Sequence, residues 1–141
     1  MTNINVGRVL LGGLVAGVVL NIGEAILNGW LLADAMKADF TKLNLPAEPS
    51  GSFIIRAVGM TFILGIVLVY LYAAIRPRFG AGVKTAVCAG LIAWFFVYLY
   101  AGYFNEALGF ISTKVFLIAL VWGLGEYIVG AIVGGRLYKE A

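Results

Sequence analysis

Four long apolar runs dominate the hydropathy pattern of the chain. They extend from Val9 to Leu32, Phe53 to Ile75, Val83 to Tyr103 and Val115 to Val133. Each run approaches or exceeds the ~20 residues that a helix needs to cross ~30 Å of hydrocarbon. The pattern therefore predicts an all-α integral membrane protein, a bundle of four transmembrane helices in which residues 1–141 form a single transmembrane domain.

The first run carries a repeating stripe of small and polar residues. Gly13, Gly17, Asn21, Glu24 and Asn28 follow one another at steps of four, four, three and four residues, so a helix places them all on one face. The two glycines predict close packing against another helix. The asparagines are expected to form hydrogen bonds between helices, or to belong to a polar site.

The last run repeats this stripe in mirror order. Ala119, Gly123, Glu126, Gly130 and Gly134 again lie on one helical face, with the acid between glycines. Gly123, Gly130 and Gly134 are therefore predicted to pack against protein, as the glycines of the first run are.

The two acids are the centre of the candidate site. At ~1.5 Å per residue, Glu126 lies near the middle of the membrane and Glu24 about one turn further out, so the two can share one layer. An ionised acid at a helix centre costs on the order of 2.5 to 3.5 kcal/mol, so each must be paired, hydrated or protonated. Such a pair can exchange protons or bind a cation. Alternatively, it only forms hydrogen bonds with Asn21, Asn28 and Tyr127 and locks the bundle.

Arg56 completes the candidate site. It lies about one turn below the outer surface in the second run, from where its side chain can extend to the headgroups. The alternative is that it turns inward and pairs with Glu24, which lies in the same half of the membrane.

The connection at residues 33–52 is predicted to be an outer loop. Its acids, lysines and prolines indicate a short interfacial helix with Met36 and Phe40 towards lipid. A loop that docks a partner is the alternative.

The third run is rich in aromatic residues. Its small residues are predicted to face the bundle, and most aromatic side chains are predicted to face lipid or a partner, with a hydrophobic ligand as the alternative. The small residues are Ala86, Gly90, Ala93 and Ala101, and the aromatic ones are Trp94, Phe95, Phe96, Tyr98, Tyr100, Tyr103 and Phe104.

The basic residues predict the orientation. With four spans, six of them fall on the side of both termini: Arg8, Arg76, Arg78, Lys84, Arg136 and Lys139. The other four fall on the opposite side: Lys37, Lys42, Arg56 and Lys114. The positive-inside rule then places both termini in the cytoplasm.

The net charge of +3 mostly reflects this asymmetry, so we expect a lipid bilayer as partner and no nucleic acid.

Composition supports the membrane class and excludes much chemistry. The chain is 62% hydrophobic and 12% charged, against roughly 45–50% and about 25% in soluble domains. Histidine is absent and Cys88 is the single cysteine, which excludes His-ligated haem, the usual zinc sites and His-dependent nucleophilic catalysis. We therefore expect no enzyme, no cofactor and no metal site.

A weak internal repeat relates the two halves. Gly13 to Ala16 resembles Gly90 to Ala93, and Asn28 and Asn105 lie at the same offset. The four spans could therefore be two helical hairpins related as parallel repeats, as in some transporters.

Three motifs carry a family resemblance. Residues 21–28, the segment Tyr72 to Gly80 (YAAIRPRFG) and Trp122 to Glu126 (WGLGE) together resemble small four-span proteins of bacterial inner membranes, a group without an assigned activity. The resemblance implies the architecture and a multi-pass location in that membrane. Small multidrug exporters are similar in size and in having an intramembrane glutamate, and small fluoride channels are similar in size. Neither group's wider motifs are present.

Two functional hypotheses follow. The favoured one is a non-enzymatic accessory or structural subunit, which assembles as a homo-oligomer or in a larger membrane complex through its glycine and aromatic faces. The alternative is a small proton- or cation-coupled transporter or channel that uses Glu24 and Glu126.

Overall fold

The computed structural model describes residues 3–140 and is built of helices joined by short connections. Its elements are α1 (Val6–Ile26), η1 (Leu27–Leu31), α2 (Ala33–Lys42), α3 (Gly51–Phe79), α4 (Val83–Trp94), η2 (Phe95–Tyr100), α5 (Ala101–Ala107) and α6 (Thr113–Leu137). Within these described residues, four helices are long and apolar enough to span a membrane, namely Val6–Leu31, Gly51–Phe79, Val83–Ala107 and Thr113–Leu137. The chain is a multi-pass membrane protein of the predicted all-α, four-span class.

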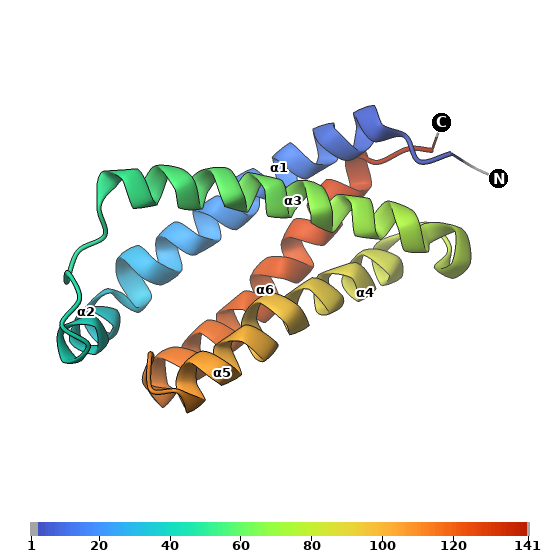
Figure 1. The fold of residues 1–141 in the computed structure, drawn as a ribbon. Coiled ribbons are helices and arrows are strands. Elements are labelled where there is room, and N and C mark those ends of the chain that lie inside the picture. The colour runs from blue at the N-terminus through green and yellow to red at the C-terminus, as the bar shows by residue number, and fades with distance from the viewer. Residues whose placement is uncertain (1–2, 141) are drawn as a thin grey trace.

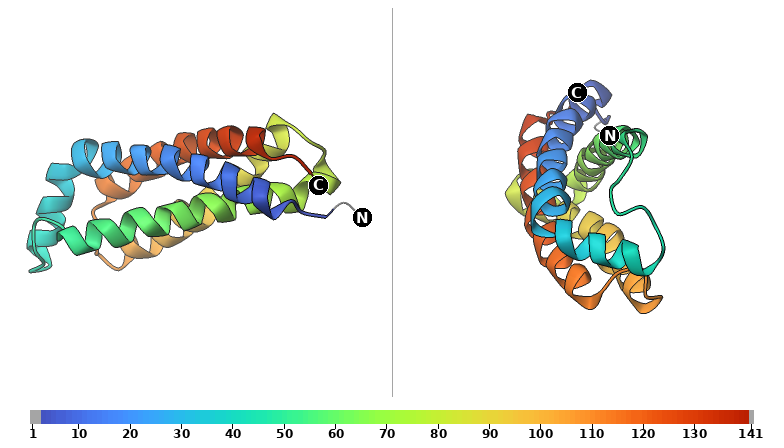
Figure 2. Two further views of the ribbon diagram at one scale, coloured as in Figure 1. Left: turned by 90° about the horizontal axis from the view of Figure 1, so that it is seen from above. Right: turned by 90° about the vertical axis from the view of Figure 1, so that its left-hand side faces the viewer.

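The long helices form two antiparallel hairpins that pack against each other. α1 packs on α3 and on α6, and α4 packs on α6 and on the last part of α3. The start of α1, the end of α6 and the α3–α4 turn lie at one end of the bundle, whereas α2 and the α5–α6 turn lie at the other (Figure 1). Figure 2 shows α2 crossing that second end. We call the two ends the terminal end and the α2 end.

The third span contains a segment that the sequence pattern did not predict. η2 consists of wider π-helical turns, which insert an extra residue relative to an α-helix and so rotate the face that follows. Ala86 and Gly90, before this segment, are buried as predicted, but Ala101, after it, is exposed. Gly102 faces α6 instead, where an added Cβ would lie 2.9 Å from the Phe116 ring. The residue that faces the bundle here is Gly102, so the prediction that Ala101 does so is wrong by one position.

The second span also runs further than predicted. The second apolar run ends at Ile75, but α3 continues through Pro77, which lies in its last turn, to Phe79. Gly80 ends the helix because it adopts a left-handed conformation (φ 85°) that glycine tolerates, and its N–H donates to the Arg76 carbonyl at 2.8 Å.

Close backbone approaches hold α1 against its neighbours. Gly13 and Gly17 lie on α3, where a Cβ on Gly17 would be 2.6 Å from the Phe62 ring. On the facing helix, a Cβ on Gly65 would be 2.5 Å from both the Gly13 carbonyl oxygen and the Gly17 nitrogen. The atoms that a Cβ on Gly65 would meet belong to the backbone of α1, so they cannot move aside as a side chain can. The contact therefore needs glycine on both helices.

The stripe on α6 packs elsewhere. A Cβ on Gly134 would meet the Gly12 carbonyl oxygen at 2.8 Å, and one on Gly130 would meet the Leu20 side chain at 3.2 Å. Gly123 lies against the ring of Tyr98, 2.5 Å from a built Cβ. The stripes of the first and last spans thus contact different neighbours, and Gly13 and Gly17 do not face Gly130 and Gly134.

Two apolar clusters form the core. The larger one lies between α1, α3, α4 and α6, and includes Leu20, Leu68 and Ala131. The smaller one, at the α2 end, is built on Leu27, Leu32 and Val115. Met36 packs against this second cluster, so its predicted lipid-facing position is wrong. The reason is that α2 folds back across the bundle end and turns part of its apolar face towards α6.

Candidate functional site

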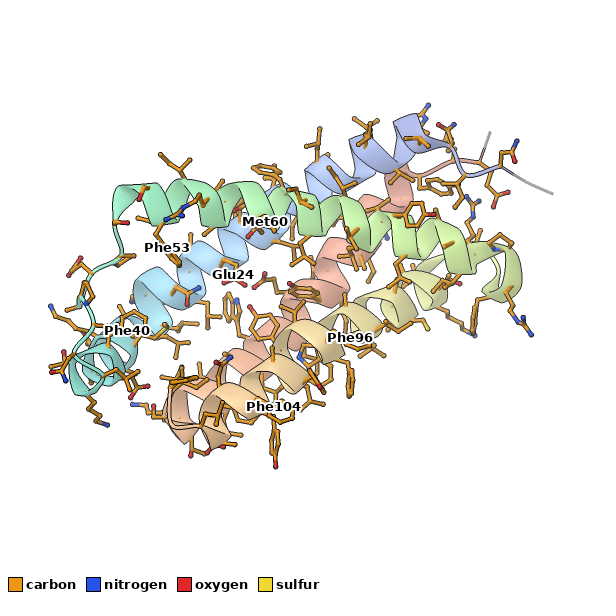
Figure 3. The ribbon with its side chains drawn as sticks, viewed as in Figure 1. Glu24, Phe40, Phe53, Met60, Phe96 and Phe104 are labelled. Carbon is orange, nitrogen blue, oxygen red and sulfur yellow. The ribbon has the colours of Figure 1, made fainter. Side chains whose placement is uncertain are left out.

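Glu24 lies near the end of α1 with both carboxylate oxygens in hydrogen bonds. Its Oε1 accepts from the Tyr98 hydroxyl at 2.5 Å, and its Oε2 accepts from Asn28 Nδ2 at 2.7 Å. Asn28 Nδ2 also donates to the Glu24 carbonyl oxygen at 3.0 Å. In Figure 3 Glu24 lies between α3 and the α4–η2–α5 helix. The carboxylate is therefore supplied with donors from two helices.

Glu126, on α6, is the more buried acid, with 8% of its surface exposed. Its Oε2 accepts from Trp122 Nε1 at 3.0 Å, one helical turn earlier. Its Oε1 is buried and has no hydrogen-bond partner among residues 3–140. Gly23 makes room for this carboxylate, because a Cβ there would lie 2.6 Å from Glu126 Cδ and Oε2. The oxygen that Trp122 holds therefore lies beside the backbone of α1, and the other oxygen of this buried acid is left without a donor.

Tyr98 joins the two acids into one cluster. Its hydroxyl donates to Glu24, and its ring packs edge to face on Tyr127, with centroids 5.5 Å apart and planes at 85°. Tyr127 follows Glu126 in α6, and Gly23, which touches Glu126, precedes Glu24 in α1. The acids and Tyr98 come from α1, η2 and α6, and we call Glu24, Tyr98 and Glu126 the carboxylate cluster.

A side-open groove of about 760 Å³ runs between α1 and α6 and reaches Glu126. Most of its lining is aliphatic: Val19, Ile22, Ile26, Leu117, Ile118, Val121 and Val129. Gly23, Gly125 and Trp122 complete the lining, and Glu126 is its one ionisable residue in the part of the chain that the structure describes. The groove therefore combines a hydrocarbon-like wall with a single acidic position.

Asn21 lies outside this cluster. Its Nδ2 donates to the Gly17 carbonyl at 2.9 Å and reaches the Val58 carbonyl of α3 at 3.5 Å, so it connects α1 to α3. This is the hydrogen-bonding role that the sequence left open for it.

Arg56 also lies outside the cluster. Its side chain is exposed and its Nε donates to the Ser52 carbonyl at 3.2 Å. The suggested inward pairing with Glu24 is wrong, because Arg56 lies in the exposed first part of α3 and the Glu24 oxygens accept from Tyr98 and Asn28 instead.

Two members of the site were missed from the sequence. Tyr98 was grouped with the outward aromatic residues, and the wider turns of η2 make its direction unreadable from a 3.6-residue period. Trp122 had a readable signal, because it precedes Glu126 by four residues and so shares its helical face.

A third acid, Asp39, fixes the α2 end. It is 6% exposed, and its Oδ2 accepts from the Ser112 backbone N–H at 2.8 Å and from Ser112 Oγ at 2.9 Å. These bonds, the one from the backbone first, hold the pKa of Asp39 below its usual value against the opposing effect of burial, and Lys42 adds to the lowering. Because Ser112 immediately precedes α6, the carboxylate caps that helix and ties α2 to it.

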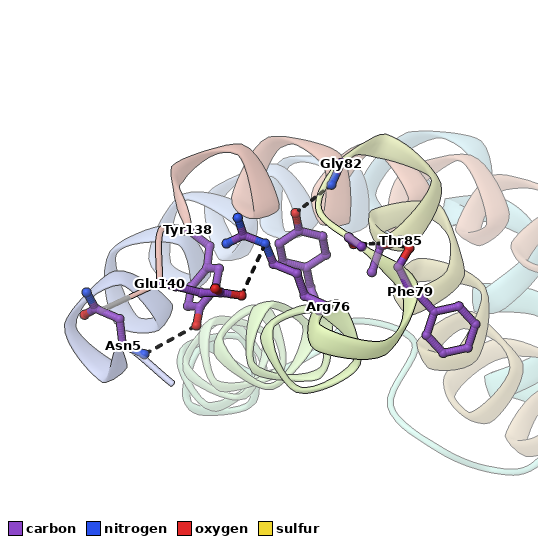
Figure 4. A network of polar contacts seen from close by, with 9 residues as sticks. Asn5, Arg76, Phe79, Gly82, Thr85, Tyr138 and Glu140 are labelled. Atoms are coloured by element: carbon purple, nitrogen blue, oxygen red, sulfur yellow. Dashed lines mark hydrogen bonds and ion pairs between the residues drawn. The ribbon is translucent and has the colours of Figure 1, made fainter. Parts of the chain in front are cut away.

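A second polar network closes the terminal end (Figure 4). Arg76 Nε lies 3.6 Å from a carboxylate oxygen of Glu140, and its guanidinium lies 5.4 Å from the centre of the Tyr138 ring. The Tyr138 hydroxyl accepts from the Asn5 N–H at 3.4 Å. The network attaches the segment after α6 to α3 and to the start of α1.

Neither a metal site nor a similarity to a known protein assigns a function to this site. No group of three or more His, Cys, Asp or Glu side chains is placed to hold a metal ion within residues 3–140, and Cys88 is a half-buried free thiol. No protein-family model, curated protein or solved structure matches the chain, so the functional argument is carried by the geometry of the carboxylate cluster.

Proposed function

We propose that this membrane protein is a small non-enzymatic ion-coupled transporter or channel, in which the carboxylate cluster exchanges a proton or binds a monovalent cation. The observation that carries the proposal is the open Oε1 of Glu126. An unsatisfied buried polar atom costs about 1–3 kcal/mol, and more when the group is charged. An acid that served only to lock the bundle would have both oxygens satisfied, as Glu24 has.

The surroundings of Glu126 support an ion-exchanging role for this acid over a purely structural one. A bound proton or cation removes the negative charge of a side chain that has few donors and little solvent around it. Trp122 keeps Oε2 engaged, so the exchanging position is Oε1. Tyr98 connects the same layer to Glu24, whose side chain is only half-buried and offers a second acid for the ion.

Proton flux in proteoliposomes tests this function. The Glu24→Gln and Glu126→Gln variants keep the shape of the side chain and remove the titrating group. We expect wild-type flux that both variants lose, while Glu48→Gln, at an exposed position of the α2 end, retains it. Absence of flux in the wild type with proton, sodium and potassium gradients, or full flux in both cluster variants, would contradict the proposal.

We further propose a bacterial inner membrane with both termini in the cytoplasm. Six of the ten basic residues belong to the terminal end, which supports this orientation by the positive-inside rule. Lys42→Cys in a Cys88→Ala background should be labelled by an impermeant thiol reagent from outside. Labelling of position 42 only from the cytoplasmic side would reverse the orientation.

Assembly as an accessory or self-associating subunit is the second candidate. It is favoured by the first ten residues of α3, Gly51–Met60, which are all exposed although they belong to a span. A span that packs on its own bundle normally buries one stripe, so this segment leaves most of its surface to lipid or to another helix. Single-molecule photobleaching in lipid bilayers should find oligomers that Gly59→Trp disrupts. Monomers at all protein densities would contradict self-association.

A further inference from the structure

The two acids of the carboxylate cluster differ in the hydrogen-bond donors around them. Both oxygens of Glu24 accept, one from the Tyr98 hydroxyl and the other from Asn28 Nδ2. Glu126 accepts a single bond, from Trp122 Nε1 to Oε2, and its Oε1 has no partner in the part of the chain that the structure describes. An ionised carboxylate is an acceptor only, whereas a protonated one carries an O–H group and accepts fewer bonds. The donors therefore match an ionised Glu24 and a protonated Glu126.

We infer that the ion held by the carboxylate cluster is a proton, that it is bound to Oε1 of Glu126, and that Glu24 is the ionised partner acid. The inference rests on the proposed function, because it uses the same cluster, and it chooses the proton over a monovalent cation. When the proton binds, a lone pair of Oε1 forms the new O–H bond, and the hydronium ion that gives up the proton becomes water. The cluster then carries one negative charge instead of two.

The charges around Glu126 favour its neutral form. Neither acid of the cluster belongs to an ion pair within the described residues. The titratable groups that interact with Glu126 are Glu24 from α1, Tyr98 from η2 and Tyr127 from α6 itself, and none of them is basic. On α3, Arg56 is exposed, and the other basic residues of α3 and α4 lie at the terminal end. A buried carboxylate without a counter-ion is costly and takes up a proton instead.

The space around Oε1 selects a proton over a metal cation. Protein atoms enclose this oxygen, so a hydrated cation does not fit beside it. A dehydrated metal cation needs a shell of oxygen ligands, but the polar group bonded to this carboxylate is the Trp122 N–H, which is a donor. On the α1 side, even a Cβ added to Gly23 would lie 2.6 Å from Glu126 Cδ and Oε2. A proton needs no ligand shell, because it forms a covalent bond to one oxygen, and its exchange with water needs only a brief opening of the packing.

Infrared spectroscopy of the protein in dodecylmaltoside, which has no carbonyl group, tests the inference. A protonated carboxyl has a C=O stretching band that an ionised carboxylate lacks. Near neutral pH we expect one such band in the wild type and its loss in Glu126→Gln. Glu24→Gln and the exposed control Glu48→Gln should both keep the band. Absence of the band in the wild type, its retention in Glu126→Gln, or its loss in Glu24→Gln would overturn the inference.

Trp122 provides a second test that leaves both acids in place. In the protonated side chain of Glu126, Oε2 is the carbonyl oxygen, and it accepts from Trp122 Nε1. Trp122→Phe should therefore move the band to higher frequency, because a hydrogen bond to a carbonyl oxygen weakens the C=O bond. Tyr98→Phe is the matched control, since Tyr98 donates to Glu24, and it should leave the band in place. An unshifted band in Trp122→Phe, or a shift in Tyr98→Phe alone, would overturn the assignment of the proton to Glu126.

Sodium chloride and potassium chloride, added at constant pH, separate a proton site from a cation site. The band of a proton site should remain in both salts, because neither cation fits beside Oε1. Loss of the band on addition of either salt would show that the cation replaces the proton, and it would overturn the inference.

The proposed function and this inference fail separately. If the band of Glu126 is present but no ion flux occurs, the proton site stands and ion coupling is wrong. If flux depends on Glu126 and on a sodium or potassium gradient while the wild type has no band, the proton site is wrong and the ion-coupled function stands.

Discussion

The contact between α1 and α3 can be tested with a single methyl group at Gly65. In the native bundle, a Cβ added there would lie 2.5 Å from the Gly13 carbonyl oxygen, 2.5 Å from the Gly17 nitrogen and 2.7 Å from Gly17 Cα. All three atoms belong to the backbone of α1, so no side chain can rotate away. The Gly65→Ala variant must therefore separate the two helices.

The required separation sets the magnitude of the effect. Ordinary van der Waals contact begins at 3.4 Å, so the backbones must part by about 0.9 Å. A gap of ~0.5–1 Å forfeits about a quarter to a half of the dispersion energy of each facing contact, and overpacking of a close interface typically costs about 1–3 kcal/mol. Because relief here needs movement of a whole helix, we expect Gly65→Ala to destabilise the protein by about 3 kcal/mol.

Gly59→Ala is a matched control on the same helix. A Cβ at position 59 meets nothing within 4 Å, so this variant gains the same intrinsic preference of alanine over glycine without a clash. The difference between the two variants isolates the steric term. At about 1.4 kcal/mol per factor of ten, the loss of about 3 kcal/mol expected for Gly65→Ala corresponds to roughly a hundredfold change in the unfolding equilibrium.

Reversible unfolding in mixed micelles of dodecylmaltoside and sodium dodecyl sulfate, followed by circular dichroism, measures this difference. The wider spacing should also break the hydrogen bond from Asn21 to the Val58 carbonyl, already long at 3.5 Å. Free energies of unfolding for Gly65→Ala and Gly59→Ala that agree within about 0.5 kcal/mol, the usual range for surface substitutions, would refute the close approach of α1 and α3.

Three further predictions concern individual contacts. Because the folded-state pKa of Asp39 lies below its usual 3.8, the bond to Ser112 should stabilise the protein above that pH and be lost as the pH falls through the lower, folded-state pKa; a loss of amide protection in α2 on acidification, measured relative to the intrinsic exchange rate at each pH and absent in Asp39→Asn, would show this. Tyr98→Phe should cost about 1.5–3 kcal/mol in the same unfolding assay, because it removes a hydroxyl that donates to a carboxylate, and an unchanged stability would argue against that bond. Gly134→Ala should destabilise the bundle more than Gly130→Ala, since its Cβ would meet a carbonyl oxygen of α1 at 2.8 Å while the Cβ at 130 meets only side chains, the nearest at 3.2 Å; the reverse order would contradict the packing of α6 on α1.

The sequence by itself determined the class, the number of spans and the positions of the two intramembrane acids. This information is readable because the bilayer fixes the length of an apolar run and requires each spanning segment to satisfy its own backbone. Glu24 and Glu126 stand out for the same reason, since a carboxylate in such a run is costly wherever the helix packs. Stripes at a helical period likewise identify small residues such as Gly13 and Gly17 as contact positions.

Only the tertiary structure decided which surfaces meet. The spacing of small residues on one helix does not indicate which other helix packs against them. The pairing of Gly13 and Gly17 with α3 could therefore not be predicted from the sequence. The wider turns of η2 arise without a clear sequence signal and redirect Tyr98 towards Glu24. The open Oε1 of Glu126 depends on every atom packed around it. A hydrophobic pattern records the depth and face of each residue, whereas the partners of a buried polar atom are set by the three helices that converge on it.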